Sequence, residues 1–111
     1  MNINDLILKL DLIKITEFKL IDKIISGGYT SDLLSDVIAN AKKDNLWITI
    51  QTHVNTIAVA SLKELAGIIV VKGKAPDLDT LIKADQEKIP LFNTYMNAYQ
   101  ISGKLYELGI R

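Results

Sequence analysis

Residues Gly27 to Leu65 read GGYTSDLLSDVIANAKKDNLWITIQTHVNTIAVASLKEL, and this stretch decides the fold. It predicts a turn at Gly27-Gly28, a helix capped by Thr30 or Ser31, a strand from Leu46 to Gln51, and a second helix capped by Thr52. The strand is rich in β-branched and aromatic residues, as strands in sheets are. The expected buried faces of the two helices are Leu33, Leu34, Val37, Ile38 and Ala41 in the first and Val54, Ile57, Ala58, Leu62 and Leu65 in the second.

The residues after this stretch continue the alternation of strands and helices. Gly67 to Val71 is a run of five apolar residues, which is typical of a central strand covered on both faces. A helix with Leu78, Leu81 and Ile82 inward comes next, followed by a strand from Ile89 to Asn93 and a helix that Asn97 caps and Gly109 ends. The order β-α-β-α-β-α predicts right-handed crossovers and helices on the faces of a mostly parallel sheet.

The N-terminal segment adds a short helix and two strands. Its apolar residues recur at helical spacing in Ile3, Leu6, Ile7 and Leu10, with Asn2 or Asn4 as the cap. Leu12 to Thr16 and Leu20 to Ser26 are the two predicted strands, and the glycine pair ends the second. The sheet is therefore expected to have about five strands.

Length and composition favour a single domain over residues 1–111 in the cytoplasm. Acidic and basic residues balance at 13 each, so no overall field draws the chain to nucleic acid or a membrane. The absence of cysteine excludes disulfides and thiolate metal sites and suits a reducing compartment. The first residues make a poor signal peptide, because Asp5 precedes the apolar run and no small-residue cleavage site follows. The longest apolar run is too short to span a bilayer.

No motif for nucleotide-dependent catalysis is present. The nearest match to a phosphate-binding loop is GIIVVKGKA, Gly67 to Ala75. It has five residues between its glycines where four are needed, and Ala75 replaces the hydroxyl that would bind magnesium. The G-x-G-x-x-G dinucleotide fingerprint is also missing. We therefore expect no catalytic residues.

A polar rim is predicted at the ends of two strands, where open α/β sheets bind ligands. His53, the only histidine, falls between a strand and a helix. A phosphate or carboxylate ligand is one interpretation, and a surface residue in a capping turn is the favoured one. A metal site is not expected, because one histidine without cysteine offers few ligands. The candidate ligand-binding residues are Tyr29, Thr30, Ser31, Asp32, Gln51, Thr52, His53 and Asn55.

Two further groups of residues have alternative explanations. Asp32 and Asp36 share a helix face, so they suit acid–base chemistry or magnesium binding, but a solvated face near the helix start is favoured. Tyr95, Tyr99 and Tyr106 are either packing residues or part of a homodimer face, and Tyr95 and Tyr99 are also candidates to line a pocket.

The chain resembles a known family. GGYTSDLLSDVIANAKKDNLWITIQTH, NTIAVASLKELAGIIVV and IPLFNTYMNAYQISGKLYELGI are similar to the small stand-alone DRTGG-domain proteins of bacteria and archaea. DRTGG domains also occur in the N-terminal half of HPr serine kinase/phosphorylase and beside CBS domains. The resemblance implies a three-layer α/β/α sandwich, similar to the N-terminal domain of that kinase and of the muramyl ligases.

The resemblance also suggests functions. The main hypothesis is a non-catalytic regulatory or ligand-sensing domain, acting alone or as a homodimer, which binds a nucleotide or another phosphorylated metabolite and docks on a protein partner. An HPr serine kinase activity is disfavoured, because the kinase's phosphate loop lies in its other domain. The third hypothesis is an adaptor for a hydrogenase-like redox complex, since short relatives are often encoded near such genes. The family's D-R-T-G-G element aligns with Lys72 to Pro76, which reads KGKAP and keeps only the glycine.

Overall fold

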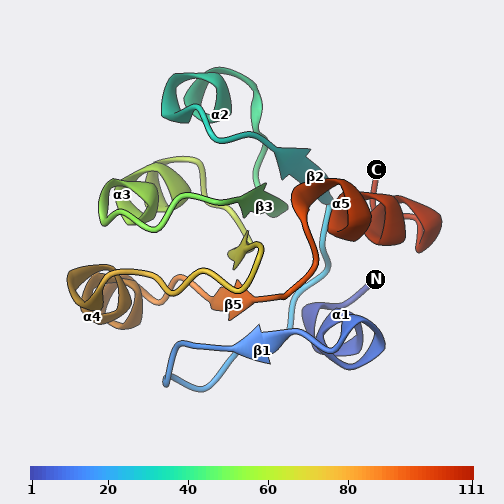
Figure 1. Ribbon diagram of the computed structural model, residues 1–111, viewed down its shortest axis with the longest axis horizontal. Coiled ribbons are helices and arrows are strands. Elements are labelled where there is room, and N and C mark those ends of the chain that lie inside the picture. Colours follow the sequence, from blue (N-terminus) through green and yellow to red (C-terminus); the bar gives the residue numbers. More distant parts are fainter.

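The computed structural model describes all 111 residues, which form five helices and five strands (Figure 1). The strands are β1 (Ile13–Lys14), β2 (Gly27–Thr30), β3 (Asn45–Thr49), β4 (Gly67–Val70) and β5 (Leu91–Asn93). The helices are α1 (Ile3–Leu10), α2 (Leu34–Asn40), α3 (Asn55–Leu62), α4 (Leu78–Glu87) and α5 (Ala98–Glu107). No helix combines the length and the apolar character that crossing a membrane requires.

The five strands form one sheet in the order β1-β5-β4-β3-β2. Strands β2, β3, β4 and β5 run parallel, and β1 pairs antiparallel with β5 at one edge. Strand β4, the apolar run, is buried at every position in the middle of the sheet. The predicted mostly parallel sheet of about five strands is confirmed.

The helices cover both faces of the sheet. Figure 1 shows α2, α3 and α4 on one face and α1 and α5 on the other. Each face has its own apolar core: one joins residues of α1 and α5 to the sheet, and the other joins residues of α2, α3 and α4 to it. The predicted three-layer α/β/α sandwich is therefore confirmed.

The glycine pair corrects the sequence prediction for the second strand. Gly27 and Gly28 begin strand β2 instead of forming a turn, and the predicted strand from Leu20 to Ser26 reduces to one bridge between Ile24 and Asn2. The physical reason lies in the crowding at Gly27. A β-carbon there would lie 2.7 Å from the carbonyl oxygen of Arg111, so the strand can pass the end of the chain only without a side chain.

The predicted inward faces of α2, α3 and α4 are partly wrong. Within α2 only Val37 is buried, and Leu33 and Ile38 are exposed, as are Leu62 of α3 and Leu78 and Ile82 of α4. The buried residues of α3 and α4 include small or hydroxylated ones beside the apolar Ile57 and Val59; they are Thr56, Ala60, Thr80 and Ala84. Short threonine side chains bury well here because their hydroxyls bond to nearby carbonyls: Thr80 donates to the Thr52 oxygen at 2.8 Å.

The last helix follows the prediction closely. The Asn97 side chain accepts a hydrogen bond from the Gln100 backbone N–H at 2.8 Å, and the Gln100 side chain accepts one from the Asn97 backbone N–H at 3.1 Å. This is a reciprocal capping box. Gly109 follows the helix with a φ of 93°, a conformation that favours glycine.

Candidate functional site

The carboxyl ends of β2 and β3 meet, as the predicted polar rim requires. The Asp32 carboxylate oxygen Oδ1 accepts hydrogen bonds from the Thr49 hydroxyl at 2.8 Å and from the Ile50 backbone N–H at 2.9 Å. The Gln51 side-chain amide donates to the Asp32 carbonyl at 3.0 Å. Asp32 therefore ties the loop after β2 to the loop after β3, and one of its two carboxylate oxygens is committed to that structural role.

The sheet separates Tyr29 from Thr30, because neighbouring residues of a strand point to opposite faces. The Tyr29 hydroxyl donates to the Asp36 carboxylate at 2.7 Å, on the side of α2. The Thr30 hydroxyl shares a 2.7 Å hydrogen bond with the Ser102 hydroxyl, on the side of α5. These two predicted site residues cannot contact the same small ligand from one face of the sheet.

The predicted caps of α2 and α3 are wrong, and His53 supplies the side-chain acceptor at the start of α3. Ser31 accepts only the Leu33 backbone N–H, at 3.2 Å, and the N-cap position of α2 is Leu33. At α3, the acceptor for the first turn is the His53 ring nitrogen Nδ1, which receives the Asn55 backbone N–H at 3.1 Å. The predicted cap Thr52 contributes only its carbonyl, to Thr80 and Asp77. His53 thus lies in a capping turn, the interpretation that its sequence position favoured.

The loop in place of the family's D-R-T-G-G element packs against a tyrosine. Lys72 and Gly73 both have positive φ, at 59° and 64°. A β-carbon on Gly73 would lie 2.9 Å from the Tyr95 ring, which shows how closely that ring covers the loop. Tyr99 is 84% exposed, so the packing explanation is wrong for this tyrosine. Tyr95 is 83% exposed but lies against Gly73 and lines a cavity. A homodimer face remains a prediction.

The main cavities of the molecule lie away from Asp32, Gln51 and His53. Two of them, each of about 580 Å³, open at the amino-terminal edge of the parallel strands. The first, which we term the Phe18 cavity, is lined by Phe18, Lys19, Ile21, Lys23, Leu65, Lys88 and Pro90. The second, the Arg111 cavity, is lined by Ser26, Gly28, Tyr29, Asn40, Lys42, Lys43, Asn45 and Arg111. The lining of each contains three cationic side chains and no acidic one.

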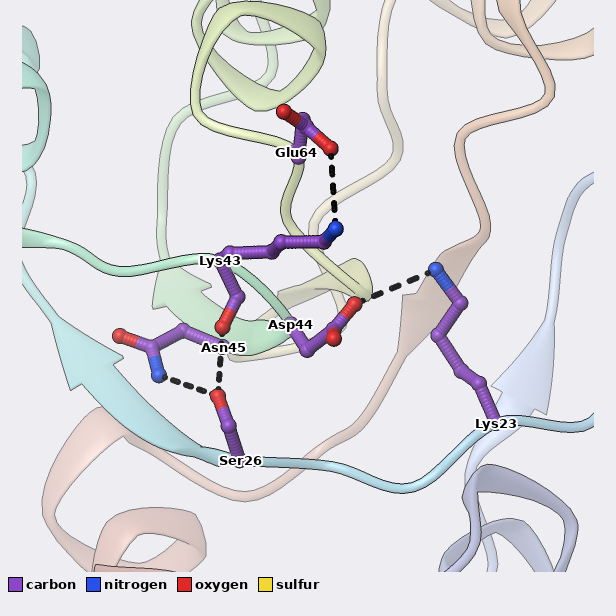
Figure 2. Close-up of polar contacts among 6 residues, drawn as sticks. All are labelled: Lys23, Ser26, Lys43, Asp44, Asn45 and Glu64. Atoms are coloured by element: carbon purple, nitrogen blue, oxygen red, sulfur yellow. Dashed lines mark hydrogen bonds and ion pairs between the residues drawn. The ribbon is translucent and has the colours of Figure 1, made fainter.

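A polar network includes lining residues of both cavities (Figure 2). Lys23 of the Phe18 cavity pairs with Asp44 at 3.5 Å, and Lys43 of the Arg111 cavity pairs with Glu64 at 3.5 Å. Ser26 connects the strands by donating to the Lys43 carbonyl at 2.6 Å and accepting from the Asn45 amide at 3.0 Å. The two exposed ion pairs contribute little to stability, so a ligand anion can compete for either lysine at small cost.

The Tyr29–Asp36 pair affects the electrostatics beside the Arg111 cavity, which Tyr29 lines. The hydrogen bond from Tyr29 favours the charged carboxylate and lowers the pKa of Asp36, and the same bond raises the pKa of Tyr29. The predicted shared helix face of Asp32 and Asp36 is wrong, because α2 begins at Leu34 and Asp32 lies before it. The two carboxylates accept hydrogen bonds from different protein donors. No group of three or more histidine, cysteine, aspartate or glutamate residues is arranged to hold a metal ion.

The sequence alone did not reveal the Phe18 cavity, because its residues come from three separate places in the chain. Leu65 and Pro90 lie just before β4 and β5, Lys88 follows α4, and Phe18 belongs to the segment after β1. The only local signal is Phe18 itself, an aromatic residue in a charged segment between Lys14 and Lys23.

No family model matches the chain, and no curated protein matches it. The chain is similar to the crystal structure of the CBS and DRTGG domains of the regulatory region of Clostridium perfringens pyrophosphatase, complexed with the activator diadenosine tetraphosphate. The TM-score is 0.67 at 11% sequence identity, and the match covers 91% of this chain and 44% of that chain. The similarity shows a shared fold, and this chain spans less than half the length of the pyrophosphatase chain that it matches. The matched structure includes a DRTGG domain, the family that the sequence resembles.

Proposed function

We propose that this chain is a non-catalytic regulatory domain that binds a nucleotide or another phosphorylated metabolite. The observation that supports the proposal most is its fold, shared with part of an enzyme's regulatory region that was solved with a nucleotide activator. Two cavities whose charged lining residues are all cationic supply a place for phosphate groups. Gly67 to Ala75 lacks the glycine spacing and the hydroxyl side chain that a kinase phosphate loop needs.

A thermal-melt screen against nucleotides, acyl phosphates and common metabolites tests this function. A ligand at about a hundred times its dissociation constant adds roughly 2.7 kcal/mol to the free energy of unfolding. In a domain of this size, that raises the melting temperature by several degrees. A screen in which no phosphorylated compound shifts the melting temperature would remove the proposal.

The enzymatic alternative has a direct test. Incubation of the protein with labelled ATP and HPr is expected to give no phosphoserine, because the chain contributes no cradle for the transferred phosphate. Phosphoserine on HPr that depends on this protein would replace the regulatory function with a kinase activity.

A further inference from the structure

We propose that the Phe18 cavity is the nucleotide site, with the base against Phe18 and the phosphates among Lys19, Lys23 and Lys88. This inference rests on the proposed function and assigns its position and ligand class. The cavity of about 580 Å³ lies within the range of sites for small organic ligands. It lies at the amino-terminal edge of the sheet, opposite the polar rim at Asp32 and Gln51.

The lining of the cavity divides into an apolar part and a cationic part. Phe18, Ile21, Leu65 and Pro90 form the apolar part, which suits a planar base better than a bare inorganic anion. The three lysines form the cationic part. Only Lys23 has a carboxylate partner within 4.0 Å, so the ammonium groups of Lys19 and Lys88 are free to neutralise phosphate.

The aromatic ring is held in place before any ligand arrives. The Asp85 carboxylate oxygen Oδ1 accepts hydrogen bonds from the Glu17 and Phe18 backbone N–H groups at 2.9 and 3.0 Å. These bonds fix the segment after β1 to helix α4. The ammonium groups of Lys88 and Lys14 lie 5.4 and 5.9 Å from the centre of the Phe18 ring, so two cations already lie beside the ring. A preorganised arrangement of this kind lowers the entropic cost of binding.

The Arg111 cavity is the weaker candidate for the base, because Tyr29 is the only large apolar residue in its lining. Its cations can attract a phosphate, but its lining offers little apolar surface for a base. The two cavities therefore predict different responses to a nucleotide and to a polyphosphate without a base.

The test uses the full ¹⁵N-labelled chain and three probes at constant ionic strength: ATP, inorganic tripolyphosphate and adenosine. ATP is expected to shift the backbone amide signals of Phe18, Ile21 and Leu65. Phe18→Leu is expected to weaken ATP binding at least about fivefold and to leave tripolyphosphate binding unchanged, because stacking on the base is lost. Lys88→Gln is expected to weaken binding of both phosphate probes about threefold or more.

Lys42→Gln is the matched control, because it removes one positive charge from the Arg111 cavity, as Lys88→Gln does from the Phe18 cavity. Both Lys42→Gln and His53→Ala are expected to leave ATP affinity unchanged. If ATP binds but its affinity falls only in Lys42→Gln or His53→Ala, the site assignment is wrong and the proposed function survives. If none of the three probes binds, the assignment of a nucleotide to this cavity fails, whereas the proposed function fails only if the thermal-melt screen also finds no phosphorylated ligand. Lys88 is an exposed residue, so Lys88→Gln keeps the assignment testable should Phe18→Leu not fold.

Discussion

The Tyr29 hydroxyl donates a 2.7 Å hydrogen bond to the Asp36 carboxylate and so ties edge strand β2 to helix α2. The Asn40 side-chain amide donates to the same carboxylate oxygen at 2.9 Å. The hydrogen bond from Tyr29 is the largest cause of the lowered pKa of Asp36, and the pKa of Tyr29 is raised by the same bond. The protonation of Asp36 in α2 therefore depends on the position of Tyr29 in β2.

Replacing Tyr29 by phenylalanine is expected to raise the pKa of Asp36 toward its ordinary value of 3.8. A lowered folded-state pKa stabilises the fold above the unfolded-state value, and that stability is lost as pH falls through the folded-state value. Tyr29→Phe should therefore reduce the loss of stability on acidification below about pH 4. An NMR titration of the Asp36 carboxyl carbon measures the change, and an unaltered titration curve would contradict it.

The raised pKa of Tyr29 acts at the alkaline end. Its contribution to stability is fully present below the ordinary value of 10.0 and is lost as pH rises through the folded-state value. Asp36→Asn is expected to lower the pKa of Tyr29, because it removes both the charge and the strongest acceptor. The ultraviolet absorbance of the phenolate measures this change. The same titration in Tyr99→Phe identifies the contribution of an exposed tyrosine to the curve.

Gly67 and Gly103 are expected to respond in opposite directions to alanine. A β-carbon on Gly67 would lie 3.0 Å from the Pro90 carbonyl oxygen and 3.2 Å from the Phe92 ring. The carbonyl cannot move freely, because it accepts the Ile68 backbone N–H at 2.9 Å, so Gly67→Ala should cost about 1–3 kcal/mol. Gly103 lies in α5 with open space around it, so Gly103→Ala should stabilise by about 0.5–1 kcal/mol. Urea unfolding of both variants checks the pair, and equal effects would be inconsistent with this packing.

Asp32→Ala is expected to destabilise the fold by about 1 kcal/mol, because the Thr49 hydroxyl and the Ile50 N–H lose their acceptor. Asp32→Asn keeps an acceptor oxygen and should cost less. The fluorescence of Trp47 reports unfolding, since this residue is the only tryptophan and is buried with its indole N–H bonded to the Ser31 carbonyl at 2.8 Å. A larger loss in the asparagine variant than in the alanine variant would exclude a structural role for this carboxylate.

Asn97→Ala removes the capping box of α5 and is expected to cost about 1 kcal/mol of stability. Asn97→Ser retains a hydroxyl acceptor and should recover most of the loss. Thermal unfolding measures both variants, and a drop of roughly 4–8 °C in melting temperature corresponds to about 1 kcal/mol in a small domain. Identical melting temperatures for the wild type and Asn97→Ala would mean that the cap is dispensable.

Local patterns in the sequence predicted the sheet better than they predicted the helix faces. The apolar run at Gly67 to Val71 identified the central strand, since only a strand covered on both faces is apolar at every position. Helix α3 is apolar on nearly all sides, so its spacing could not show that Leu62 is exposed. At Gly27 the deciding contact comes from Arg111 at the other end of the chain, and no local pattern carries that information.

The candidate site shows the same limit. The polar rim was predictable because the carboxyl ends of neighbouring parallel strands meet by topology, and Asp32 does reach Thr49. The Phe18 cavity forms between segments that are far apart in the sequence. Asp85 holds one of them by hydrogen bonds to Phe18 and Glu17, which lie 67 and 68 positions earlier. Such contacts follow from the three-dimensional fold and leave no periodic trace in the sequence.

The antiparallel edge strand β1 has a consequence for how the chain folds. It is held by hydrogen bonds from Ile15 to Leu91 and from Leu91 to Thr16, the latter across 75 sequence positions. Strands β2 to β5 and their crossover helices build up from neighbouring units, whereas β1 must close almost the entire chain, an entropic cost that grows with the length of the loop. We therefore expect the N-terminal segment to dock last and open first. In hydrogen exchange, the Ile15 amide should lose protection before the amides of β3 and β4.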